Sequence, residues 1–317
     1  MKPAVLLVDG DMFLHRSLHI KSLYNFTNSS GERTGILYGV LNSLFKLLDT
    51  FQGYEVTNIC FLLTTGKSFR LSIDENYKFK SQKDQTTWTE VLPELGMSRG
   101  EYYKRQKELV KTILPTFGIK VFWRPSFEAD DIAAFLSKLD FQGKRKILIS
   151  DDYDWCHLVS PEIDLFRFTK EDFITLENFE EILGIKSPEL HCLYLSIIGG
   201  HDNIPGVLRG FGEVSARKMV NSLKDTTLPS ILEWAEQQSG KARGFLEEEV
   251  HKRLEMNLKL VNLHGVQFDT EFRRDIKSQL LEKYSYNTEE MMKTIRKYDF
   301  KSFVKIIDTA KLFPLFS

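Results

Sequence analysis

Apolar residues in the first half of the chain form short continuous runs that alternate with helical repeats. Over 35–51 and 129–139 the apolar residues recur at helical spacing. Continuous runs are typical of strands buried on both faces of a sheet, and they occur at 4–11, 56–66, 119–124 and 144–152. This alternation predicts an α/β fold whose parallel sheet is covered by helices on both faces.

Two segments depart from the alternation. Residues 68–105 are polar and rich in Lys, Gln and Tyr, which is typical of an insertion with helices but little core of its own. From about residue 185 the pattern turns helical, with apolar repeats at 187–200, 213–223, 228–238 and 245–263. We therefore expect an α/β domain over 1–185 and a helical region over 186–317.

Acidic residues follow the predicted strands. Asp9 ends the first run, and "EADD" (128–131) opens the helix after the third. The fourth run leads into "SDDYD" (150–154). Because parallel strands share one carboxyl edge, we expect these acids to gather there, where Mg²⁺ or Mn²⁺ would relieve their repulsion. The alternative for "EADD" alone is a solvated first helical turn, where acids favour the positive end of the helix dipole.

Charge is segregated although the net charge of the 317-residue chain is only −1. Residues 67–124 hold twelve Lys and Arg against seven Asp and Glu, which leaves five positive charges in excess. Residues 203–224 hold four bases and one acid. Basic surfaces beside an acidic site suit a polyanion that approaches a metal, although such faces are often merely solvated.

The remaining composition indicates a cytoplasmic protein without a membrane segment. No run of 18 apolar residues occurs, and the apolar N-terminal run is too short for a signal peptide. Cys60, Cys156 and Cys192 show no metal-type spacing and are expected as reduced, part-buried thiols.

The segment "GGHDNIPGVLRGFGEVSARKMV" (199–220) suggests a second kind of site. Two helical runs joined by a tight hairpin at Gly210–Gly212 predict a helix–hairpin–helix. In such a motif glycines let backbone N–H groups approach a phosphate, and Arg217 and Lys218 would add charge. An ordinary helix–loop–helix is the alternative.

These motifs together resemble those of the 5′ nucleases, the flap endonucleases and 5′→3′ exonucleases of phage and bacterial type, over nearly the whole chain. The motifs that carry the resemblance are "VDGDMFLHR", "GKSFRLSIDENYKFK", "FEADD", "ISDDYDW" and "DNIPGV…GFG". The resemblance implies a PIN-like nuclease domain (1–185) with a helical arch at 68–105. It also implies a DNA-binding region (186–317) with a helix–hairpin–helix at about 190–222.

The resemblance also implies roles for individual residues. The metal ligands would be Asp9, Glu128, Asp130, Asp131, Asp152, Asp154 and Asp202, and the catalytic residues Arg70, Lys78 and Asp130. The nucleic-acid-binding residues would be Arg16, Lys67, Arg70, Lys78, Lys80, Lys83, Gly210, Gly212, Arg217 and Lys218.

The function implied is structure-specific 5′ nuclease activity in replication or repair, in a bacterial cell or a phage-infected host. Two Mg²⁺ or Mn²⁺ ions would serve as cofactors, with K⁺ a candidate at the helix–hairpin–helix. The partner would be DNA with a free 5′ end, flap or nick, bound by a monomer, and an RNA–DNA hybrid stays an open alternative.

Two positions depart from the family pattern. Thr64 and Gly199 stand where acids are expected, so we expect an altered metal demand, with Asp11, Asp151 or His201 as candidates to compensate. The competing interpretations are a non-catalytic or weakly active protein that binds branched DNA, and a ribonuclease that removes primers.

Overall fold

The structure, a computed structural model, describes residues 1–78, 82–199, 202–282 and 288–308. The chain folds into two compact units, each built from segments that are distant in sequence. The first unit holds residues 1–65, 80–149 and 269–317, and the second holds 66–79 and 150–268. This division differs from the boundary expected near residue 185, because residues 66–79 and 150–185 belong to the second unit and the last helices belong to the first.

A parallel sheet forms the centre of the first unit, as the apolar runs predict. Its strands follow the order β5-β2-β1-β6, and Leu6 of β1 pairs with Ile59 of β2 and Ile147 of β6. Residues 4–8 of β1 are fully buried, which explains their continuous apolar character. The strands span Lys2–Asp9 (β1), Tyr54–Thr65 (β2), Lys120–Pro125 (β5) and Arg145–Ile149 (β6).

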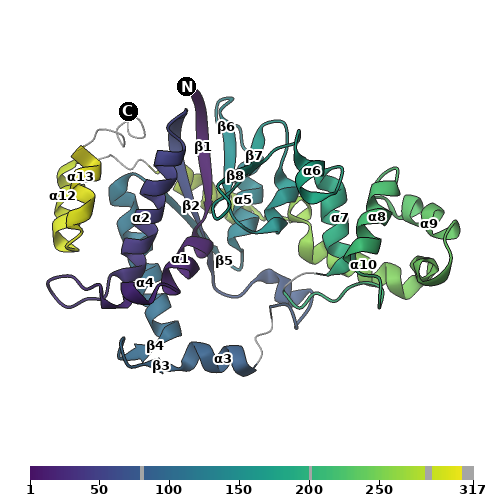
Figure 1. Cartoon of the computed structure of the whole chain (residues 1–317), viewed down its shortest axis with the longest axis horizontal. Coiled ribbons are helices and arrows are strands. Elements are labelled where there is room, and N and C mark those ends of the chain that lie inside the picture. Colours follow the sequence, from purple (N-terminus) through teal and green to yellow (C-terminus); the bar gives the residue numbers. More distant parts are fainter. Residues whose placement is uncertain (79–81, 200–201, 283–287, 309–317) are drawn as a thin grey trace. The chain divides into compact units, whose positions relative to one another are not determined.

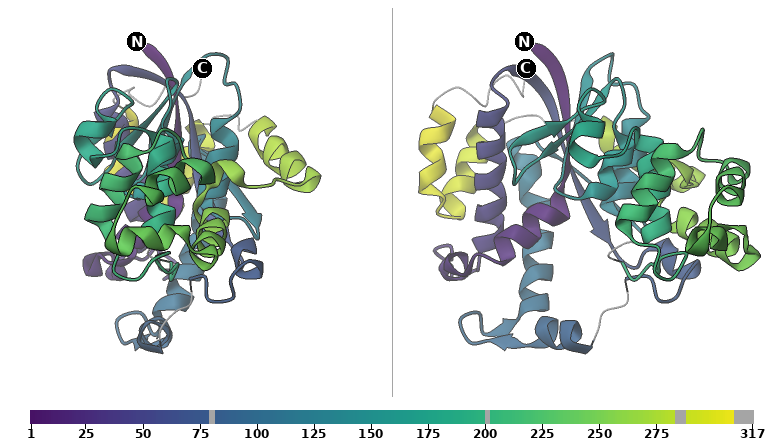
Figure 2. Two further views of the ribbon diagram at one scale, coloured as in Figure 1. Left: turned by 90° about the vertical axis from the view of Figure 1, so that its right-hand side faces the viewer. Right: turned by 45° about the vertical axis from the view of Figure 1, so that its right-hand side comes forward.

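Helices from both ends of the chain pack in the first unit. The predicted helices at 35–51 and 129–139 are confirmed as α2 and α5. In Figures 1 and 2, α12 and α13 lie beside α2, where the ring of Phe303 stacks 4.9 Å from that of Tyr38. The helices are α1 (Gly10–Leu18), α2 (Gly35–Thr50), α4 (Arg99–Ile113), α5 (Ala129–Ser137), α11 (Thr270–Leu281), α12 (Thr288–Lys297) and α13 (Lys301–Asp308), with 3-10 turns η1 (Lys21–Asn25) and η3 (Leu114–Phe117).

Strand β5 ends the row of strands in the first unit, and α11 protects its edge. The backbone N–H of Trp123 donates to Gln279 Oε1 (3.2 Å), and Trp123 O accepts from Gln279 Nε2 (3.1 Å). Arg124 pairs with Asp275 (2.7 Å) on the same helix. The Gln279 amide thus satisfies backbone groups that an exposed edge strand would offer to another chain.

The insertion contains helices, as expected, and a hairpin that the sequence did not indicate. Helix α3 (Gln82–Thr89) precedes the antiparallel pair β3 (Val91–Leu92) and β4 (Met97–Ser98), and α4 follows. Figures 1 and 2 show α3 and the hairpin at the N-terminal end of α4, away from the sheet of the first unit. Strands of two residues are too short to show a period of two.

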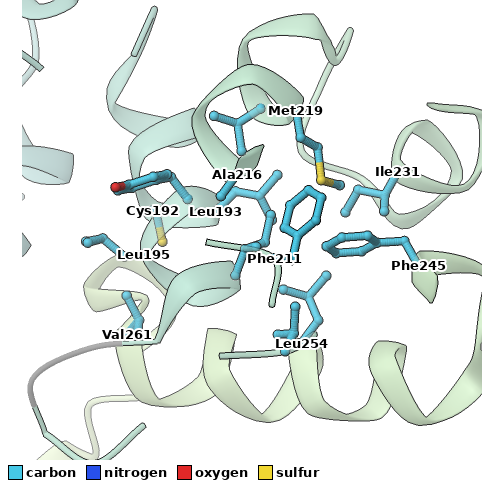
Figure 3. Close-up of a cluster of buried hydrophobic side chains, with 14 of the residues drawn as sticks. Cys192, Leu193, Leu195, Phe211, Ala216, Met219, Ile231, Phe245, Leu254 and Val261 are labelled. Atoms are coloured by element: carbon cyan, nitrogen blue, oxygen red, sulfur yellow. The ribbon is translucent and has the colours of Figure 1, made fainter. Parts of the chain in front are cut away.

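The second unit is mainly helical around one apolar core. Figure 3 shows that Phe211, Met219, Phe245 and Leu254 converge there, and the rings of Phe211 and Phe245 lie 5.0 Å apart. The four helices predicted after residue 185 are confirmed, whereas the antiparallel pair β7 (Ile163–Arg167) and β8 (Asp172–Ile174) was not foreseen. The helices are α6 (Phe179–Leu183), α7 (Pro188–Ile198), α8 (Glu213–Ser222), α9 (Leu228–Glu236) and α10 (Glu248–Val261), with 3-10 turns η2 (Phe69–Ser72), η4 (Tyr153–Leu158), η5 (Gly240–Leu246) and η6 (Leu263–Gly265).

The segment expected as a helix–hairpin–helix differs from the prediction in one respect. Helices α7 and α8 flank it, but residues 202–212 form turns and extended backbone, so no helix directly precedes Gly210. Residues 203–206 ("NIPG") form no helix, since Pro205 and Gly206 disfavour helix. Gly212 is the N-cap of α8, and classification of the whole segment as a helix–hairpin–helix stays a prediction.

Acid is expected to destabilise the second unit through His157. This side chain is buried, and its Nε2 accepts a hydrogen bond from Leu263 N–H (3.2 Å). Burial, followed by the nearby His264, His191 and Arg70, lowers the pKa of His157 from 6.5 to about 3. Between these values only the unfolded state binds the proton, so the free energy of unfolding falls as the pH drops from 6.5 towards 3. Urea unfolding at several pH values measures this dependence. His157→Gln should make the free energy of unfolding vary less with pH, and a pH dependence equal to that of wild type contradicts the assignment. Exposed His19, replaced by Gln, is the control.

Candidate metal-binding and nucleic-acid-binding residues

Asp9 stands where strand β1 turns into α1, at the carboxyl edge of the sheet. Its Oδ1 accepts the N–H of Met12 (3.0 Å), so the side chain caps the helix, and the residue is 8% exposed. The next residue must be small, because a Cβ at Gly10 would lie 2.5 Å from the carbonyl oxygen of Leu62. The motif "VDG" therefore places a nearly buried carboxylate at this edge.

The acids of "EADD" begin helix α5. Glu128 and Asp131 form a capping box in which Asp131 Oδ2 accepts the N–H of Glu128 (2.8 Å), and both residues are buried. Asp130 is half-buried in the same first turn. The alternative interpretation of the motif, a solvated first helical turn, does not fit Glu128 and Asp131, because both are buried, although Asp131 does cap the helix.

Thr64, which replaces an expected acid, is held at the carboxyl end of β2. Its Oγ1 accepts the N–H of Ala129 (3.0 Å) at the start of α5, and its own N–H donates to Asp11 Oδ2 (2.7 Å). The hydroxyl thus satisfies a free N–H of the first helical turn. Thr64 joins β2, α5 and α1 at this edge.

Two residues of α4 also reach the edge, and the sequence did not single them out. Tyr103 donates its hydroxyl to Asp11 Oδ1 (3.2 Å), and the ammonium of Lys107 contacts the same oxygen and Thr64 O (2.6 Å). Burial and then the charges of Asp11 and Asp9 raise the pKa of Tyr103, so its hydroxyl stays protonated. The spacing of four residues, which puts both on one helix face, was the available signal.

In the second unit the charges of Asp152 and Asp202 both act on Asp154. Asp152 Oδ1 accepts the N–H of Asp154 (2.9 Å) at the start of η4. Burial, and then the charges of Asp152 and Asp202, raise the pKa of Asp154 to about 7, while Lys78 and Arg70 act in the opposite direction. Three acids from two chain-distant segments therefore share one electrostatic environment.

Lys78 is tied to Asp202 by backbone and side chain. Its N–H donates to Asp202 O (2.9 Å), and its Nζ lies 3.3 Å from Asp202 Oδ2. The Tyr77 hydroxyl donates to the same carboxylate oxygen (3.2 Å). The Lys78 side chain is 43% exposed, so its ammonium is accessible to an anion from solution.

Arg70 is placed differently from the expectation of a nucleic-acid contact. The residue is only 1% exposed, its Nε donates to Leu260 O (2.7 Å), and its guanidinium lies 4.8 Å from the Phe69 ring centre. A side chain so deeply buried cannot meet a phosphate at the surface of the second unit. Its charge instead acts on Asp154, whose pKa it lowers.

Asp151, one of the residues expected to compensate for the missing acids, is already hydrogen-bonded. The Asp151 carboxylate accepts Thr169 N–H (2.8 Å) and contacts the Thr169 hydroxyl, so it is engaged in a turn beside β7 and β8.

Gly199 has φ +78°, and a Cβ there would clash with the carbonyl oxygen of Ile204. The local backbone therefore requires glycine. His201 and Lys80 lie outside the described residues, and the Lys83 side chain does too.

The other basic candidates divide into exposed and packed side chains. Arg217 lies over the Tyr194 ring (5.7 Å to its centre) and against Gly184. The ammonium of Lys241, which the sequence did not single out, lies beside Gly210. The exposed basic side chains are those of Arg16, Lys67 and Lys218, and the candidate glycines Gly210 and Gly212 are exposed as well.

The donor chemistry of both units fits a hard divalent cation. Carboxylate oxygens are the ligands that Mg²⁺ prefers, and repulsion among Asp152, Asp154 and Asp202 is what such an ion would relieve. Within the part of the chain that the structure describes, no three His, Cys, Asp or Glu side chains lie close enough to hold one ion. No helix of that part is long and apolar enough to span a bilayer.

Cation binding by the second unit is expected to strengthen as the pH rises through about 7. Below that pH the Asp154 carboxyl is protonated in the folded state and must release its proton to bind a cation. Between 3.8 and about 7 only the folded state holds this proton, so the metal-free protein loses stability as the pH rises through that window. Mn²⁺ affinity measured against pH tests this. Asp152→Asn moves the midpoint to lower pH because it removes a repelling charge, and an unmoved midpoint would contradict the assignment.

A parallel α/β sheet with a nearly buried carboxylate at its carboxyl edge is consistent with a resolvase-like nuclease domain. The N-terminal resolvase-like domain of 5′-3′ exonucleases matches residues 4–184. This chain belongs to the 5′-3′ exonuclease N-terminal domain family, because that match covers more than half of its length.

Relatives and solved structures agree with this placement. A 5′-3′ exonuclease of Buchnera aphidicola is 30% identical over 205 residues, 64% of this chain and 65% of its own length. One of Aquifex aeolicus is 25% identical over 306 residues, 95% of this chain and 94% of its own. The chain thus spans about two thirds of the length of the Buchnera relatives that it matches.

The fold is shared with a bacteriophage T5 flap endonuclease that was solved with DNA and metal ions. The TM-score is 0.66 at 22% identity, with 89% of this chain and 100% of the other covered. The T5 5′-exonuclease with bound zinc has a TM-score of 0.60 at 22% identity over 94% of this chain and 99% of the other.

Proposed function

We propose that the protein is a structure-specific 5′ nuclease that hydrolyses phosphodiester bonds with divalent metal ions. The observation that carries the proposal is the group of Asp152, Asp154 and Asp202 with the accessible ammonium of Lys78. Anionic and cationic groups side by side suit a cation and a phosphate at once. Mg²⁺ or Mn²⁺ is the cofactor we propose. The candidate ligands are Asp9, Glu128, Asp130 and Asp131 in the first unit and Asp152, Asp154 and Asp202 in the second.

Individual residues of the chain have different roles in the proposed reaction. A bound divalent cation would supply an activated water and stabilise the charge on the leaving oxygen. Lys78 binds and orients the phosphate through its exposed ammonium. The Asp154 carboxyl loses its proton near neutral pH, which makes the group competent to hold a cation, and Arg70 favours that loss from its buried position.

The substrate we propose is DNA with a free 5′ end, at a flap or nick, bound by a monomer. Support comes from the excess of basic residues over 67–124 and from the exposed Lys218 and Lys241 near Gly210. The turn before α8, where Gly210 and Gly212 are exposed, is the proposed site for a phosphate or for K⁺.

A second candidate function is the binding of branched DNA without efficient cleavage. Gly199 favours it, because the backbone there excludes the acid that the family pattern places at this position. Thr64 also favours binding without cleavage, since its hydroxyl oxygen already accepts the N–H of Ala129.

Cleavage of a labelled 5′-flap duplex with Mg²⁺, Mn²⁺ or no metal separates the two. We expect cleavage only with metal, and faster with Mn²⁺, because fewer carboxylates hold the ion. The same assay on a nicked RNA–DNA hybrid shows whether the protein cleaves an RNA 5′ strand as well as a DNA one. Tight, steeply salt-dependent flap binding with no product in either metal would sink the nuclease proposal in favour of the binder.

A further inference from the structure

The ammonium of Lys107 occupies the sheet edge of the first unit between Asp11 and Thr64. It contacts Asp11 Oδ1 and lies 2.6 Å from the carbonyl oxygen of Thr64. The Lys107 side chain is 13% exposed and that of Asp11 is 20% exposed, so the pair is largely shielded from water. Shielded charges interact more strongly than charges at an open surface.

Asp11 is therefore committed to donors of this chain. One carboxylate oxygen accepts the N–H of Thr64 (2.7 Å), and the other accepts from Lys107 and the Tyr103 hydroxyl (3.2 Å). A carboxylate with both oxygens engaged by N–H, O–H and ammonium groups is a poor ligand for a further cation. The expectation that Asp11 replaces a missing metal ligand does not fit this geometry.

A divalent cation at this part of the edge would also be repelled. Thr64 contributes no charge, and Lys107 places a fixed positive charge between the Asp11 carboxylate and the Thr64 carbonyl oxygen. Two positive charges at contact distance repel each other strongly in a partly buried site.

We propose that Lys107 is a built-in cation that takes the place of a divalent ion on the Asp11–Thr64 side of the acidic edge of the first unit. The inference rests on the proposed function, since it concerns the same acidic edge. Lys107 is a positioning residue here: it neutralises Asp11 and holds α4 against α1 and β2.

Mn²⁺ binding to the full chain, measured by electron paramagnetic resonance and calorimetry, tests the proposal without any turnover. Lys107→Met keeps much of the side-chain volume and removes the charge. We expect it to bind one additional Mn²⁺ per chain, or the same number about tenfold more tightly. Lys107→Arg, which retains the charge, and Lys104→Met, which removes a charge from the exposed face of the same helix, leave Mn²⁺ binding unchanged.

A purely structural role for Lys107 predicts a different result. In that case Lys107→Met lowers the melting temperature while Mn²⁺ binding stays that of wild type, and this outcome overturns the proposal. If Lys107→Met does not fold, Asp11→Asn is tested in its place. This variant leaves the Lys107 ammonium without its carboxylate, so Mn²⁺ binding should weaken several-fold. An unchanged Mn²⁺ affinity would contradict the proposal. A protein that shows the expected Mn²⁺ changes but never cleaves flap DNA refutes the nuclease proposal alone.

Discussion

Asp154→Asn lowers metal-dependent cleavage of a 5′-flap duplex at least about a hundredfold, the loss expected when a metal ligand worth several kcal/mol is removed. The substitution keeps the size of the side chain and removes a negative charge from the group formed with Asp152 and Asp202. Because the neutral amide no longer repels these two acids, the protein itself is expected to be as stable as wild type or more stable at pH 8. Single-turnover cleavage and thermal unfolding measure the two effects separately.

Asp151→Asn is the matched control in the same short segment. The Asp151 carboxylate accepts from Thr169, and an Asn oxygen can still accept that backbone N–H, so cleavage should stay close to the wild-type rate. Equal rates for wild type and Asp154→Asn, or equal losses in the two variants, would show that Asp154 has no special role.

Gly199→Asp destabilises the second unit and does not restore a metal ligand. An L-residue at φ +78° costs about 1–2 kcal/mol, and the clash of its Cβ with Ile204 O adds an overpacking cost of about 1–3 kcal/mol. The free energy of unfolding should therefore fall by roughly 3 kcal/mol. Urea unfolding gives this difference, and Mn²⁺ affinity should not rise.

Gly212→Asp is the control for the same change of side chain. The backbone at Gly212 is extended, a Cβ there meets nothing within 4 Å, and the residue is the N-cap of α8, where Asp is favoured. Stability should be unchanged or slightly higher. A Gly199→Asp variant that is as stable as Gly212→Asp and binds Mn²⁺ more tightly would mean that the segment can rearrange to accept the acid.

The hydrophobic pattern was sufficient for the parallel strands β1, β2, β5 and β6 and for the helices from α7 to α10, because continuous burial and helical amphipathicity leave long signals. It failed for β3, β4, β7 and β8. These strands are short, and the antiparallel pairing of β7 with β8 depends on a turn rather than on a period.

The candidate site was predictable to the extent that acids follow strands. Strand order places Asp9 and the start of α5 at one edge, as the rule for parallel sheets requires. Arg70 is buried, unlike the exposed side chain expected of a nucleic-acid contact, because burial depends on tertiary packing: the Leu260 carbonyl that it contacts is 190 positions away in the chain.

By itself the sequence determined the α/β class, the acids that follow the strands and the family resemblance, because these depend on local periodicity and motif spacing. Only the tertiary structure decided what each charge faces. Lys107 meets Asp11 across 96 positions, Lys78 meets Asp202 across 124, and Gly199 is confined by Ile204. Electrostatic and steric effects act through space over a few ångströms, and no local pattern in a single sequence encodes which distant side chains come that close.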